Sequence, residues 1–136
     1  MSLNRSLFSS ASVHWSTPKQ TYEALEKEFG AFDFDPCPLG GLAIGLETEW
    51  KGNVFVNPPY GRGVETWVKK GYESAKNGGA TVVMLLPSRT DTKWFHDYAL
   101  KAQEVRFLRG RLKFGDAKNS APFPSCLVIF RPARGE

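Results

Sequence analysis

The sequence predicts an α/β domain with a mainly parallel sheet and an antiparallel pair of strands near its C-terminus. Short apolar runs alternate with amphipathic helical stretches, as in right-handed strand–helix–strand crossovers. The run 81–86 is almost entirely apolar, as expected of a parallel strand buried on both faces. Polar residues follow three of the predicted strands. The carboxyl ends of parallel strands lie at one edge of an open sheet, where ligands bind.

The first predicted helix covers residues 18–29. Thr17 and Pro18 are predicted to be its N-cap and first helical residue, and Gly30 its end. Its apolar face is formed by Tyr22, Leu25 and Phe29.

The remaining elements follow from apolar runs bounded by Gly, Pro or polar residues. The predicted strands are 32–35, 54–56, 81–86, 105–108 and 126–130. One helix carries the stripe Val64, Trp67, Val68, Tyr72 and Ala75. Another is capped by Thr90 or Asp91 and carries Trp94, Phe95 and Tyr98. The last two strands are expected to pair across the Gly115–Ser125 loop.

The length of 136 residues suits one domain with a real core. Residues 1–12 are expected to be a flexible segment and residues 13–136 the domain. No apolar stretch approaches the ~20 residues of a membrane span, and the first residues lack the apolar core of a signal peptide. These features predict a cytoplasmic protein without membrane contact.

Cysteine and histidine usage predicts reduced thiols and no metal site. Cys37 and Cys126 do not form a disulfide framework and lack metal-ligand spacing. His14 and His96 have no nearby Cys or His partner.

Charge is distributed unevenly along the chain. The net charge is +4, yet residues 1–88 carry 8 basic and 9 acidic groups, whereas residues 89–136 carry 10 basic and 5 acidic groups. The basic C-terminal third fits a polyanion partner. An ordinary solvated basic surface fits equally well.

The most informative motif is Asn57-Pro58-Pro59-Tyr60, which directly follows the apolar run 54–56. An exocyclic amino group is a poor nucleophile because its lone pair is spread into the ring. Two carbonyl oxygens that accept its hydrogens, from the Asn57 side chain and the Pro58 main chain, would free that lone pair. Tyr60 would stack on the ring, while the prolines keep the turn stiff. The alternative is a rigid strand exit without chemistry.

Six ordered segments together resemble the amino-methyltransferases, and most closely the Dam-type adenine DNA methyltransferases of phages and prophages. The segments are 14–18, 33–37, 50–52, 56–61, 90–95 and 109–114. The resemblance implies a compact, truncated Rossmann-like methyltransferase fold. It also implies S-adenosylmethionine as methyl donor, S-adenosylhomocysteine as product, and adenine in double-stranded DNA as acceptor, in a bacterial host cell.

The resemblance also assigns roles to residues. The catalytic turn would be Asn57, Pro58, Pro59 and Tyr60. Residues lining the cofactor would be Trp15, Thr17, Pro18, Asp35, Pro36 and Asn57, with Asp35 near the cofactor's ammonium group. A strand-end turn and a capped helix start remain structural alternatives for these residues.

Candidate DNA contacts are basic residues near the predicted strand ends. They are Arg62, Arg89, Lys93, Arg109, Arg111 and Lys113. Each is also compatible with solvated surface charge. Trp94 and Phe95 fit core positions better than DNA contacts, and loop 115–125 is the candidate for sequence recognition.

One departure from the family pattern is large. Only 20 residues separate Pro36 from Asn57, too few for the two strand–helix units found there in ordinary methyltransferases. Gly40, Gly41 and Gly45 do not reproduce the usual glycine-rich loop. The candidate ribose ligands are Glu47 and Glu49. An uncovered sheet edge invites pairing, and the sequence therefore admits a homodimer.

Three alternative functions stay open. A cytosine-N4 methyltransferase and a protein-glutamine methyltransferase both act on an amino or amide nitrogen. The third is a catalytically dead DNA-binding module with a truncated cofactor site.

Overall fold

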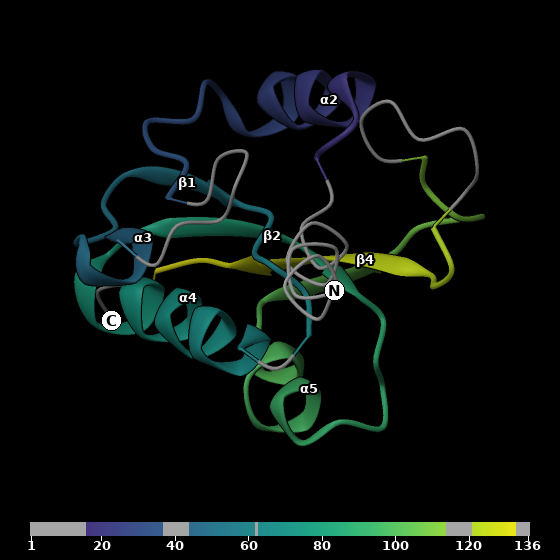
Figure 1. The fold of residues 1–136 in the computed structure, drawn as a ribbon. Coiled ribbons are helices and arrows are strands. Elements are labelled where there is room, and N and C mark those ends of the chain that lie inside the picture. Colours follow the sequence, from purple (N-terminus) through teal and green to yellow (C-terminus); the bar gives the residue numbers. More distant parts are fainter. Residues whose placement is uncertain (1–15, 37–43, 62, 114–120, 133–136) are drawn as a thin grey trace, which may run out of the picture.

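The computed structural model describes residues 16–36, 44–61, 63–113 and 121–132. Its helices are α2 (Lys19–Phe29), α3 (Ile44–Glu47), α4 (Val64–Gly78), α5 (Lys93–Asp97) and the 3-10 helix η1 (Ala99–Lys101). Its strands are β1 (Asn53–Val56), β2 (Thr81–Pro87), β3 (Glu104–Phe107) and β4 (Ser125–Phe130). The sheet lies between α2 on one face and α4 and α5 on the other (Figure 1).

The sheet is mixed, with the strand order β1-β2-β4-β3. β1 and β2 pair in parallel, whereas β4 is antiparallel to both β2 and β3. The expected antiparallel C-terminal pair is therefore confirmed, but a mostly parallel sheet is not. The reason is that β4 returns between β2 and β3 and makes both of its ladders antiparallel. β1, β2 and β3 nevertheless run in the same direction.

The segment predicted as strand 32–35 is reduced to a single parallel bridge between Phe34 and Val54. Main-chain bonds hold it, from Asp33 N to Asn53 O at 2.8 Å and from Phe55 N to Phe34 O at 3.1 Å. The Asp33 carboxylate also accepts from Asn53 N at 2.9 Å. This segment therefore lies directly beside β1, in the same direction.

Each face of the sheet has its own apolar core. On the α2 face, Tyr22, Phe32 and Phe55 form an aromatic cluster with ring centroids 5.1 to 5.5 Å apart. On the α4 and α5 face, Trp94 and Phe95 are 7% and 1% exposed and belong to the core, which confirms the core prediction for both.

The start of α2 differs from the prediction. The helix begins at Lys19, Pro18 occupies the N-cap position in extended geometry, and no side chain caps the helix. The Thr17 hydroxyl instead accepts a hydrogen bond from Asn57, 40 residues away. A tertiary partner has thus replaced the local capping bond.

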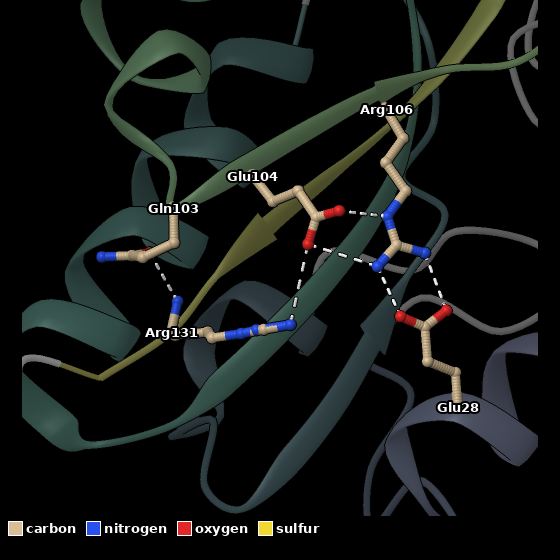
Figure 2. Close-up of polar contacts among 5 residues, drawn as sticks. All are labelled: Glu28, Gln103, Glu104, Arg106 and Arg131. Atoms are coloured by element: carbon tan, nitrogen blue, oxygen red, sulfur yellow. Dashed lines mark hydrogen bonds and ion pairs between the residues drawn. The ribbon is translucent and has the colours of Figure 1, made fainter.

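A charged cluster joins the end of α2 to the edge strand β3 (Figure 2). Arg106 binds the Glu28 carboxylate with both terminal nitrogens and also donates to Glu104. Arg131 lies 3.7 Å from Glu104 and donates its main-chain N–H to Gln103 at 2.7 Å. We call these five residues the Arg106 clasp.

The Arg106 clasp should make stability sensitive to acid. Hydrogen bonds from Arg106 lower the pKa of both Glu28 and Glu104. A lowered carboxyl pKa stabilises the fold above the unfolded-state pKa, and this contribution is lost as pH falls through the folded pKa. We therefore expect Glu28→Gln to lower the Tm at pH 7, with the difference from wild type shrinking towards pH 3. Thermal melts between pH 7 and pH 3 measure the difference in Tm between the two proteins. A difference that stays constant with pH would contradict a stabilising role for the Glu28 carboxylate.

Candidate active site

The exits of four segments that run in the same direction lie at one edge of the sheet. Asp35 follows the Phe34 bridge, Asn57 follows β1, Ser88 follows β2 and Leu108 follows β3. β3 shares this direction because it and β2 are both antiparallel to β4. We call this edge the catalytic edge, since it holds the turn 57–60 that the sequence predicts to be catalytic.

Asn57 is buried at this edge and has a defined orientation. Its side chain is 3% exposed, and Nδ2 donates to Thr17 Oγ1 at 3.0 Å. With Nδ2 donating to Thr17, the side-chain oxygen Oδ1 is the acceptor on the other side of the amide. Two predicted cofactor-lining residues are thereby brought together.

The Thr17 bond gives a test of Asn57 orientation. A hydrogen bond contributes roughly 0.5–1.5 kcal/mol, so Thr17→Val should lower turnover up to about tenfold by freeing the Asn57 amide to rotate. Thr17→Ser keeps the hydroxyl and should retain wild-type turnover. Steady-state kinetics of the methyl transfer that the resemblance implies compare the two variants. Equal activity of the Val and Ser variants would show that the bond does not orient Asn57.

Tyr60 is held inside the protein at the catalytic edge. It is 6% exposed, and its hydroxyl donates to Leu85 O at 3.0 Å. Phe123 meets its ring edge to face, with centroids 5.3 Å apart and planes at 70°. These contacts fix the ring position, while its stacking on a substrate base stays a prediction.

Helix α3 packs closely against Pro36. A Cβ on Gly45 would collide with the Pro36 carbonyl oxygen, so only glycine allows this approach. Trp50 Nε1 donates to Gly45 O at 2.9 Å and fixes the helix from the other side. Within the described residues, this one-turn helix is the only element between the Phe34 bridge and β1.

The two candidate ribose ligands have different surroundings. Glu49 lies 3.6 Å from Lys51 and lines a cavity of about 320 Å³ with the second half of α4, including Asn77. That half of α4 leads back to the start of β2, away from the catalytic edge. Glu47 is exposed at the end of α3.

The described candidate DNA contacts are all exposed and follow the ends of β2 and β3. They are Arg89, Lys93, Arg109, Arg111 and Lys113. The Arg89 guanidinium lies 5.7 Å from the Phe123 ring centroid. Arg109 lines a cleft of about 450 Å³ between α2 and β3. Trp15 and Arg62, together with segment 1–12, Cys37 and most of loop 115–125, lie outside the described residues.

Other chemistry is sparse in the described part of the chain. No cluster of three or more metal-ligating side chains occurs there, and no helix there has the length and apolarity needed to cross a bilayer. Burial raises the pKa of the Cys126 thiol to about 11, which makes it a poor nucleophile.

Phe123 is a site residue that sequence reasoning missed. Its contact with Tyr60 spans more than 60 positions and depends on how the chain enters β4. A local signal existed, because Pro122 and Pro124 flank it and stiffen the backbone that presents the ring.

Comparison with known proteins gave consistent matches. Residues 42–136, more than half of the chain, match the family model described as DNA N-6-adenine-methyltransferase (Dam). A protein of Escherichia phage T1 with the same name is 30% identical over 110 residues, covering 72% of this chain and 45% of that protein. A second protein with this name, from Haemophilus phage HP1 (strain HP1c1), is 27% identical over 136 residues. The match covers 87% of this chain and 78% of that protein. The chain thus spans less than half the length of the T1 relative. No solved structure matches significantly.

Proposed function

Because this chain belongs to the Dam family of DNA N-6-adenine-methyltransferases, we propose that it methylates the exocyclic amino group of adenine in double-stranded DNA. The methyl donor would be S-adenosylmethionine. The observation that carries the proposal is the buried Asn57 amide, hydrogen-bonded to Thr17 at an edge that also carries exposed cations. The phage relatives support action on DNA in the cytoplasm of a bacterial host.

In this proposal the protein acts by positioning and hydrogen-bond acceptance. The Asn57 side-chain oxygen and the Pro58 carbonyl accept the two amino hydrogens, which concentrates the lone pair on nitrogen. Tyr60 holds the base after it has left the duplex. Burial of Asn57 strengthens these bonds because little water competes for them. The reaction would be a direct displacement without a covalent enzyme intermediate. A nitrogen–carbon bond forms as the carbon–sulfur bond breaks, S-adenosylhomocysteine is the leaving group, and the surplus amino proton passes to water.

The residues at the catalytic edge fit the methionine end of the cofactor. The Asp35 carboxylate is half-buried beside β1 and suits an ammonium group, while Thr17, Pro18 and Pro36 supply the neighbouring wall. When bound, S-adenosylmethionine supplies an electrophilic methyl group on a sulfonium sulfur. We propose that the sheet is a shortened Rossmann-like methyltransferase core, in which α3 replaces the usual intervening units.

Transfer of tritiated methyl groups to plasmid DNA, followed by nucleoside analysis, tests this function. N6-methyladenine is the expected product. N4-methylcytosine would indicate the cytosine alternative, and label in protein would indicate a glutamine methyltransferase. Retained DNA binding without methyl transfer, and without heat on titration with S-adenosylmethionine, would indicate a dead module.

The basic residues after β3 give a separate prediction for DNA binding. Arg109→Ala and Arg111→Ala should each weaken binding and reduce the slope of log affinity against log salt by about 1, because each loses a phosphate contact. Lys76→Ala, in the last turn of α4, is the matched control and should leave the slope unchanged. Fluorescence anisotropy at several salt concentrations measures both the affinity for DNA and its dependence on salt. Unchanged slopes for both arginine variants would remove these residues from the interface.

A further inference from the structure

Phe107 is an exposed aromatic residue at the catalytic edge. It ends β3 and is 64% exposed; the only other large hydrophobic side chain exposed in the described ranges is Leu100, at 52%. Arg106 and Leu108 on either side face α2. Strand alternation therefore turns Phe107 to the opposite face, where Val105 packs against the core and Phe107 projects from it.

The surroundings of Phe107 are basic. Arg109, Arg111 and Lys113 follow it within six residues and are exposed, and Lys93 is exposed at the start of α5. Asp91, after β2, is an exposed acidic residue among the described residues of this region. An exposed aromatic ring among cations is suited to binding nucleic acid, because phosphates neutralise the cations and bases stack on the ring.

We propose that Phe107 is a DNA-contacting wedge that stacks against a base flanking the target adenine, an assignment that rests on the proposed function. Three strand spacings separate β3 from β1, which amounts to roughly 14 Å. At about 3.4 Å per base pair, the ring meets DNA roughly four base pairs from the catalytic turn. Phe107 therefore does not fill the gap left by the extruded base but anchors the flanking duplex.

A second copy of this chain fits Phe107 less well. β3 has four residues and carries charged side chains at Glu104 and Arg106, features that disfavour pairing at an edge.

The test compares Phe107→Ala with Leu100→Ala, which removes an exposed apolar side chain before β3 at the opposite edge of the sheet. Binding of the full chain to a duplex is measured by fluorescence anisotropy at several salt concentrations. Phe107→Ala should weaken binding about tenfold with an unchanged salt slope, because a stacking contact carries no charge. Phe107→Trp and Leu100→Ala should bind like wild type. With 2-aminopurine placed at successive flanking positions, wild type should change the fluorescence about four base pairs from the target and Phe107→Ala should not.

Several outcomes would overturn the wedge. They are unchanged affinity of Phe107→Ala, an equal loss in Leu100→Ala, or absence of DNA binding by wild type. A wild-type dimer that Phe107→Ala converts to a monomer in sedimentation would assign the ring to a second copy instead. A Phe107 effect on binding in a chain that transfers no methyl group would support the wedge and refute the proposed chemistry.

Discussion

Replacing Asn57 by alanine is expected to lower methyl transfer about 100- to 1,000-fold, the usual loss when one preorganised hydrogen-bonding group is removed from a reacting centre. Asn57 is 3% exposed and its Nδ2 already donates a hydrogen bond to Thr17. The wild-type site therefore needs no reorganisation to accept the amino hydrogens. In the alanine variant the amino lone pair stays in the ring, and only the Pro58 carbonyl remains as an acceptor.

Asn53→Ala provides the matched control for this variant. Asn53 begins the same strand, and its Nδ2 donates to Phe29 O at 2.8 Å, a bond similar to that of Asn57 but at the opposite edge of the sheet. Loss of this hydrogen bond in Asn53→Ala should lower the free energy of unfolding by about 1 kcal/mol and leave turnover unchanged. Methyl transfer and calorimetric cofactor affinity are measured for both variants. Turnover by Asn57→Ala within tenfold of wild type would contradict the catalytic assignment.

The strands and the larger helices could be predicted because their signals are local. The apolar run 81–86 became β2, and the stripe from Val64 to Ala75 became α4. Trp94 and Phe95 were predicted to be core on helical spacing and are buried. Such patterns arise because each element must bury one face, and burial of one face requires apolar residues at regular spacing within the element itself.

The parts that escaped prediction depend on distant residues. Thr17 is a good N-cap in isolation, but Asn57 competes for its hydroxyl from 40 residues away. Helix α3 has four residues, too few for a periodic signal, and is held by the contact of Gly45 with Pro36 and by the Trp50 bond. The antiparallel ladder between β2 and β4 was not predicted either, because no local feature indicates that β4 inserts between β2 and β3.

The proposed catalytic turn, residues 57–60, combines both kinds of information. Its sequence predicted the hydrogen-bond acceptors, but the burial of Tyr60 arises from Leu85 and Phe123. A residue expected at the surface of a binding pocket is thus also part of the α2-face core. Packing around Tyr60 should therefore influence catalysis, and this connection can be tested.

Phe123→Leu is expected to lower turnover about tenfold with little change in cofactor affinity. The ring of Phe123 meets Tyr60 at 5.3 Å, and an aromatic pair contributes about 0.5–1.5 kcal/mol beyond its buried area. Leucine fills part of the volume but cannot hold the Tyr60 ring edge to face. A small displacement of Tyr60 then misplaces the base, and errors of about 1 Å in reacting geometry can cost 100-fold in rate.

Phe130→Leu separates this effect from a general loss of stability. Phe130 pairs with Tyr72 at 6.0 Å with planes at 70°, the same edge-to-face geometry, but on the other face and at the other edge of the sheet. Both variants should lose roughly 1–2 kcal/mol of stability, because each removes part of a buried phenyl ring. Only Phe123→Leu should lose turnover when the two are assayed well below their melting temperatures. Equal turnover of the two variants would mean that Phe123 supports the fold alone, and that Tyr60 keeps its catalytic position through the Leu85 bond.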